Sequence, residues 1–165
     1  MKNTPTSTYR IDEFTFRRFH VPKCYLRTIK ANLSEQYLWI STDETVDILE
    51  RYVVNVIVSN LRSTNPQIPY LLATKIIEHV DAKTIDKVAE TSISELFHYS
   101  HDDSQVYSKI LLFVSDSAAY MLKTGKLLQT IYSNMLHVTC VAHAMHRAAE
   151  FICKQFPDVD ALTND

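Results

Sequence analysis

The chain has 165 residues, of which 17 are Lys or Arg and 19 are Asp or Glu, and its formal net charge is −2. This balance excludes a polycation that holds nucleic acid by bulk charge, although a local basic patch remains compatible with it. The single glycine, Gly125, excludes glycine-rich phosphate loops, which need several glycines close together. Three scattered cysteines argue against a disulfide scaffold and favour a reducing compartment.

No apolar run approaches the roughly 20 residues that a membrane helix needs, and the polar N-terminus lacks the apolar core of a signal peptide. We therefore expect no membrane association and no secretion. Residues 1–36 are predicted to form an N-terminal helical arm. Its basic side chains form either a solvated helix face or a surface that faces phosphates; they are Arg17, Arg18, Lys23, Arg27 and Lys30.

Three strands are predicted next, over residues 37–42, 52–61 and 70–80. The first is a short apolar run with Asp43 at its carboxyl end, and the second is rich in β-branched residues. The segment between these two strands is too short for a crossover helix, so they should pair antiparallel. The turn chemistry at Ser63–Pro66 leads into the third strand.

Alternating helices and strands follow. Asp81 is a plausible cap for an amphipathic helix that continues to Phe97, and His101–Ser104 is a polar loop. The continuous apolar run Ile110–Val114 predicts a buried strand that ends at Ser115 and Asp116. The remaining predicted elements are a helix over 117–128, a strand over 134–139 and an amphipathic helix over 141–156.

This order predicts an α/β domain with a mixed five-stranded sheet and helices on both faces. The chain stops after a helical pattern without a strong terminating element, and we therefore expect a fragment of a longer protein. Such a fragment should expose apolar surface and associate with itself.

Two aspartates stand at positions where chemistry is expected. If the first and fourth strands are parallel neighbours, Asp43 and Asp116 project into one crevice at the carboxyl ends of the strands. A divalent cation would relieve the repulsion between the two carboxylates, and Mg²⁺ favours one or two carboxylates together with phosphate oxygens. Asp116 could instead cap the following helix, and Asp43 could be a turn residue; Glu44 and Asp47 are close enough to be mistaken for the ligand.

A second constellation contains His137, Cys140, His143 and His146, each three residues from the next. Sulfur and imidazole ligands suit zinc, but the set straddles a predicted strand-to-helix junction and does not have zinc-finger spacing. These histidines could equally be structural residues with satisfied hydrogen bonds, so zinc binding stays open. Nothing in the pattern supports a nucleophilic cysteine or serine enzyme, and no small-molecule substrate is expected.

Three ordered segments resemble the catalytic domain of hAT-superfamily transposases. Trp39–Asp47 with Arg51–Val58 is similar to its first strands, Leu111–Met121 to the segment that carries its second acidic residue, and His137–His146 to its Cys-x-x-His motif. Tyr25–Gln36 resembles the helical segment that precedes this domain. Within the superfamily, the chain looks closest to the transposon-derived group that includes proteins resembling CGG triplet repeat-binding proteins.

The resemblance implies an RNase H-like fold with sheet order 3-2-1-4-5 and an antiparallel second strand. It also implies that Asp43 and Asp116 match the first two members of an Asp-Asp-Glu triad that binds Mg²⁺ or Mn²⁺. Cys140 and His143 match the motif held near that active site, which favours a role in supporting the fold or lying beside DNA.

The chain departs from the family because the catalytic glutamate, the long helical insertion and the zinc-finger domain have no counterpart in it; Glu150 does not match that glutamate by position. Residues 37–165 are thus expected to be a partial catalytic domain. Its parent would cleave DNA and transfer strands in the nucleus, while this chain alone would be inactive. The alternative is a domesticated, non-enzymatic domain that binds DNA or protein.

Overall fold

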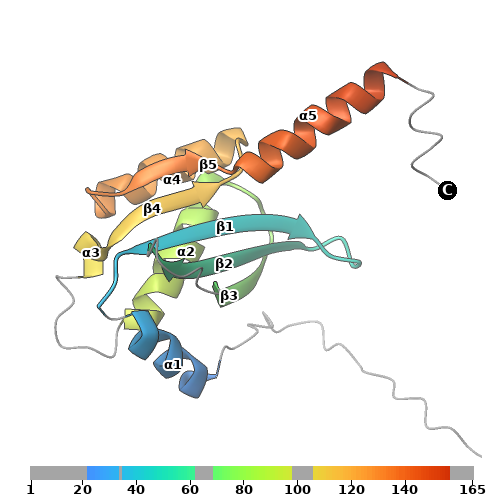
Figure 1. Cartoon of the computed structure of the whole chain (residues 1–165). Helices are drawn as coiled ribbons and strands as arrows, with labels where there is room; N and C mark the ends of the chain where they lie inside the picture. Colours follow the sequence, from blue (N-terminus) through green and yellow to red (C-terminus); the bar gives the residue numbers. More distant parts are fainter. Residues whose placement is uncertain (1–21, 34, 62–68, 98–105, 157–165) are drawn as a thin grey trace, which may run out of the picture.

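The structure is a computed structural model, and it describes residues 22–33, 35–61, 69–97 and 106–156. A five-stranded sheet carries helices on one side (Figure 1). The strands are β1 (Leu38–Val46), β2 (Tyr52–Asn60), β3 (Tyr70–Ile77), β4 (Ile110–Ser115) and β5 (Leu136–Thr139). The helices are α1 (Lys23–Leu33), α2 (Ala82–Phe97), α3 (Val106–Lys109), α4 (Ala119–Ile131) and α5 (Val141–Gln155).

The sheet has the strand order β3-β2-β1-β4-β5. β2 pairs antiparallel with both β1 and β3, whereas β4 pairs parallel with β1 and with β5. This arrangement confirms the predicted mixed five-stranded sheet of an α/β domain, with the order 3-2-1-4-5 and an antiparallel second strand. It also confirms that the first and fourth strands are adjacent and parallel.

The hydrophobic core lies between the sheet and the layer formed by α1, α2 and α4. Alternate residues of the strands are buried on this side, as at Leu38 and Ile40 of β1 and at Val56 of β2. Ile29 and Leu33 of α1 belong to the same core. The division of the chain at residue 36 stays a prediction, although α1 packs with the sheet that follows it.

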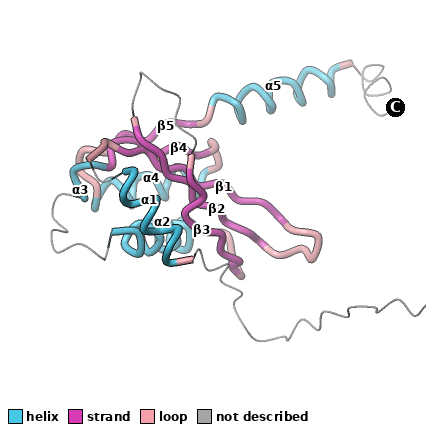
Figure 2. Tube along the Cα trace, turned by 60° about the horizontal axis from the view of Figure 1, so that its bottom comes forward, coloured by secondary structure: helices cyan, strands magenta, loops and turns pink. Residues whose placement is uncertain are grey.

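The helices were expected on both faces of the sheet, and here the structure differs. Within the described residues, α1, α2 and α4 share one face, and α5 extends away from the sheet, as the two views show (Figures 1 and 2). No residue of α5 is buried. The amphipathic pattern correctly predicted a helix there, but it carried no information about the direction in which the helix leaves β5.

Several boundaries also differ from those predicted. The third strand ends at Ile77 rather than Val80, and the helix after β4 covers 119–131 rather than 117–128. Asp81 does begin α2, because its Oδ1 accepts hydrogen bonds from the backbone N–H groups of Lys83 and Thr84 at 2.8 and 3.0 Å. The remaining predicted segments that contain residues 1–21, 101–104 and 157–165 lie outside the described residues.

Among the helices described, none combines the length and the apolar character that crossing a bilayer requires.

Candidate functional site

Asp43 lies inside β1 and does not follow it, so the predicted strand end at residue 42 is wrong. β1 continues to Val46 because β2 pairs with it along this whole length, and Asp43 is opposite Asn55. The parallel partner β4 stops earlier, since its last pairing with β1 joins Ser41 to Val114. Asp43 thus stands just beyond the end of the β1–β4 ladder, on a hairpin that projects past it.

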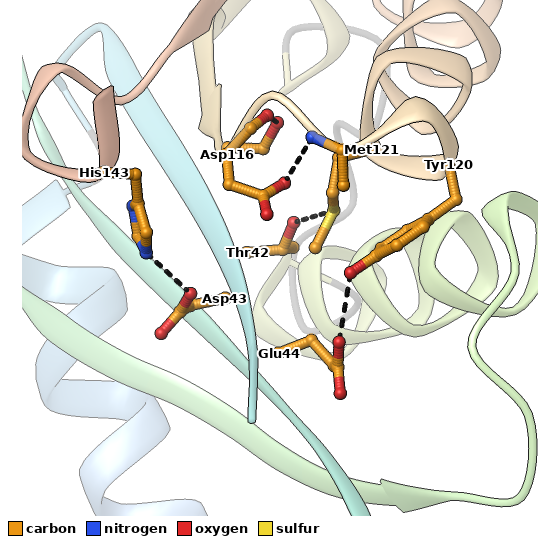
Figure 3. A network of polar contacts seen from close by, with 9 residues as sticks. Thr42, Asp43, Glu44, Asp116, Tyr120, Met121 and His143 are labelled. Carbon is orange, nitrogen blue, oxygen red and sulfur yellow. Dashed lines mark hydrogen bonds and ion pairs between the residues drawn. The ribbon is translucent and has the colours of Figure 1, made fainter. Parts of the chain in front are cut away.

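The alternation of β1 separates Asp43 from its neighbours in the sequence. Thr42 and Glu44 face the helix layer, where Thr42 Oγ1 lies 3.7 Å from Met121 Sδ and the Tyr120 hydroxyl donates to Glu44 Oε2 at 3.0 Å. Asp43 points to the other side, and its Oδ1 lies 3.5 Å from His143 Nε2 (Figure 3). The carboxylate of Glu44 is therefore committed to a different partner from that of Asp43.

Asp116 follows β4 directly, as predicted, and lies in the same region as Asp43 and His143 (Figure 3). Its Oδ1 accepts a hydrogen bond from the backbone N–H of Ala118 at 3.1 Å. The N-cap position of α4 is Ala118 itself, which offers no side-chain cap. Asp116 thus holds the turn before the helix with one oxygen instead of acting as its N-cap residue.

The carboxylates of Asp43 and Asp116 act on the same neighbours. The Cys140 thiol, Asp43 and Asp116 together raise the pKa of His143, which favours its protonated form. Burial and the Glu44 carboxylate raise the pKa of Tyr120 to about 12, and Asp116 and Asp43 contribute in the same direction. Two carboxylates at adjacent parallel strands therefore lie near enough to one imidazole and one phenol to shift their pKa values; we call Asp43, Asp116, Tyr120 and His143 the candidate site.

Cys140 and His143 meet at the start of α5. The first turn of this helix brings His143 to Asp43. The backbone N–H and the ring of His143 lower the pKa of the Cys140 thiol, and burial opposes this only in part. The backbone N–H of Cys140 also donates to the Ser115 carbonyl at 2.7 Å, which ties the start of α5 to the end of β4. The Cys-x-x-His segment thus lies beside both aspartates.

The four residues of the proposed zinc cluster do not converge. The set straddles the junction of β5 and α5, as the sequence predicted. His137 Nε2 lies 2.9 Å from Ser115 Oγ, and His146 pairs with Glu150 at 3.2 Å. Within the described part of the chain, no group of three or more His, Cys, Asp or Glu side chains is arranged to hold a metal ion.

Two residues at this site were not singled out from the sequence. The Tyr120 hydroxyl donates to Glu44 on the helix side of β1, and Arg147 donates to Ser117 Oγ at 2.7 Å. Arg147 lies one turn after His143, so a helical spacing from the Cys-x-x-His motif would have placed both on the same side of α5. No signal in the sequence pointed to Tyr120, because its partner lies 76 positions away.

The donor set suits a hard divalent cation better than zinc. The side chain of Asp43 is half exposed, and only one oxygen of Asp116 has a described partner. Mg²⁺ uses one or two carboxylates and completes its shell with water and phosphate oxygens. The two aspartates fit such an ion, while the remaining positions would have to come from substrate and solvent.

Comparisons with known proteins give a likeness in structure but none in sequence. No protein-family model matches the chain, and no curated protein matches it. Among solved structures, the chain is similar to the catalytic core domain of BIV integrase in crystal form I, with 14% sequence identity and a TM-score of 0.35. The match covers 62% of this chain and 54% of the integrase chain, so the chain spans about half the length of that structure.

Proposed function

We propose that this chain is part of a hAT-like DNA transposase catalytic domain, in which Asp43 and Asp116 hold Mg²⁺ or Mn²⁺ against a DNA phosphodiester. The observation that supports the proposal is that Asp43 and Asp116, beside adjacent parallel strands, both act on His143, whose Nε2 lies 3.5 Å from Asp43 Oδ1. The carboxyl ends of parallel strands are the usual ligand sites of α/β sheets.

Asp43, Asp116 and His143 have distinct roles in this proposal. A bound divalent cation would supply Lewis-acid stabilisation of charge on phosphate oxygens. Asp43 and Asp116 would hold that cation, and His143 beside them would donate a hydrogen bond to the phosphate backbone of DNA. The raised pKa of His143 favours the protonated form that suits this contact.

The proposal includes a limit on activity. The hAT resemblance calls for a third carboxylate, and the described residues place none with Asp43 and Asp116. We therefore expect weak metal affinity and neither DNA cleavage nor strand transfer by this chain alone. A nuclear location belongs to the same proposal, because the substrate is DNA.

Thermal unfolding with and without Mn²⁺ tests the metal site in the parent chain and in Asp43→Asn and Asp116→Asn. At a Mn²⁺ concentration about ten times the dissociation constant, the parent should gain on the order of 3 °C. Both variants should lose this gain, because an amide oxygen replaces a charged ligand. Asp116→Asn keeps an oxygen that accepts from Ala118, so its metal-free stability should change little.

Glu150→Gln is the matched control, since Glu150 is an exposed carboxylate on α5 that pairs only with His146 among the interactions described. It should keep the full gain with Mn²⁺. An equal gain in the parent and in all three variants would show that Asp43 and Asp116 are not the ligands.

The alternative, a non-enzymatic domain that binds DNA or protein, is favoured by one observation. His143 already lies within ion-pair distance of Asp43, and its protonated form would compete with a cation for that carboxylate. Binding of a fluorescent DNA duplex that is unchanged by EDTA and by both Asp→Asn substitutions would support this alternative.

A further inference from the structure

Helix α5 is an amphipathic helix without cover in the described chain. One stripe along it is apolar and consists of Val141, Met145, Ala148 and Ile152, with Phe151 beside it. The exposed fractions of Val141 and Met145 are 69% and 68%. A helix of 15 residues is marginal in water unless its apolar face packs against something. The stripe therefore marks a surface that requires a partner.

The opposite side of α5 contacts residues at the carboxyl ends of β1 and β4. His143 lies 3.5 Å from Asp43, and Arg147, one turn later, donates to Ser117 Oγ. At 100° per residue, His143 and Arg147 lie on the side of the helix away from Met145 and Ile152. These contacts place the polar side of α5 towards its own sheet, so the apolar stripe lies on the other side of the helix; α5 itself extends away from the sheet (Figures 1 and 2).

The second surface that no described helix covers is the face of the sheet opposite α1, α2 and α4, which we call the open face. Pairing in register places one row of side chains across all five strands: Val138, Val114, Ser41, Ile57 and Leu71. A parallel row contains Leu136, Leu112 and Trp39. Leu136 is 67% exposed and Leu71 is 46% exposed. These two rows of the open face are thus largely apolar, whereas the next row contains the polar pair Asp43 and Asn55.

The two surfaces match in length and in chemistry. Fifteen helical residues span about 22 Å, and five strands span about 19 Å across the sheet. Two helix-on-sheet contacts, each covering about five large apolar side chains on either surface, would remove on the order of 2,000 Å² from water. That area lies within the range of stable protein dimers.

We infer that the chain forms a two-fold symmetric dimer, in which α5 of each copy lies across the open face of the other. A second copy is the occupant that these observations favour, because each copy carries both halves of the contact and reciprocal exchange leaves neither half exposed. The argument for the contact rests on the apolar stripe of α5 and the apolar rows of the open face, and it makes no use of metal binding by Asp43 or Asp116. The inference is therefore independent of the proposed function.

Sedimentation equilibrium of the full chain tests the dimer, with one charged substitution on each surface. Met145→Lys and Leu136→Glu alter side chains that are 68% and 67% exposed, so neither should disturb the fold of the monomer. Each should weaken the dimer by roughly tenfold or more, because a charge enters two apolar contacts. Glu150→Lys, on the polar side of α5, is the control and should leave the dimer unchanged. Circular dichroism establishes that each variant is folded.

Mixing the two charged variants gives the sharper result. In a mixed dimer, one contact carries both substitutions and the other is intact, so the mixture should dimerise more tightly than either variant alone. A chain that stays monomeric up to several hundred micromolar would overturn the inference. So would a dimer that is sensitive to Met145→Lys but not to Leu136→Glu, since that result assigns the contact to paired α5 helices.

Discussion

At the scale of single residues, Gly125 shows how closely the helix layer approaches the sheet. A Cβ at this position would lie 2.2 Å from Nδ1 of His137 and 2.6 Å from its Cγ, which is far inside van der Waals contact. The ring of His137 is held in place, because its Nε2 lies 2.9 Å from Ser115 Oγ. The only glycine of the sequence is thus the residue that allows α4 to pack directly on β5.

Gly125→Ala should therefore destabilise the protein by about 1–2 kcal/mol, because overpacking outweighs the gain of about 1 kcal/mol in helix propensity. In a His137→Ala background the same substitution should be neutral or stabilising, since the ring is gone. Urea unfolding of the four proteins in this double-mutant cycle measures the difference. An equal loss in both backgrounds would contradict the steric explanation.

Cys140 is expected to be more reactive than the other two cysteines. The backbone N–H and ring of His143 lower the pKa of its thiol, so a larger fraction is thiolate at neutral pH. Alkylation by iodoacetamide should be faster at Cys140 than at Cys153, which lies in the last turn of the same helix. His143→Gln should slow Cys140 selectively. Peptide mass spectrometry between pH 6 and 9 measures each rate, and equal rates at both cysteines would refute the assignment.

At the scale of elements, Asp81 defines the start of α2. Its carboxylate accepts hydrogen bonds from the N–H groups of Lys83 and Thr84 and from the Thr84 hydroxyl, and these bonds lower its pKa. A pKa lowered by folding stabilises the folded state above the unfolded value, near pH 4, and this stabilisation is lost as the pH falls through the folded pKa.

Asp81→Ala should lower the melting temperature by about 2–4 °C at pH 7. The difference from the parent should shrink as the pH falls below about 4, because the parent then loses the same interaction. Asp81→Ser retains a capping oxygen and should keep most of the stability without this pH dependence. Differential scanning calorimetry at a series of pH values gives the comparison, and a difference that grows at low pH would have the wrong sign.

At the scale of the whole molecule, stability should be distributed unevenly. β1 lies between β2 and β4, and its Leu38 and Ile40 are fully buried, whereas no residue of α5 is buried. At low protein concentration, backbone hydrogen exchange should therefore be slowest in β1, β2 and β4. Among the helices longer than one turn, exchange should be fastest in α5. Protection of α5 equal to that of α2 in the monomer would show that α5 folds back onto its own chain.

The sequence by itself determined the order and type of the main elements. Apolar runs such as Ile110–Val114 and the helical spacing after Asp81 are local signals, because burial of a strand or helix face acts residue by residue along the chain. Short connections then required antiparallel pairing of the first strands. The positions of Asp43 and Asp116 near adjacent strands follow from that order, together with the family resemblance.

Only the tertiary structure decided how these elements end and which way side chains face. β1 continues through Asp43 because β2 pairs with it beyond the end of β4, and the alternation of β1 then sends Glu44 to Tyr120 and Asp43 to His143. The start of α5 is joined to distant residues by the hydrogen bonds from Cys140 N–H to the Ser115 carbonyl and from Arg147 to Ser117, which lies 30 positions away. Such contacts join segments that are far apart in the sequence, so local hydrophobic periodicity cannot predict them.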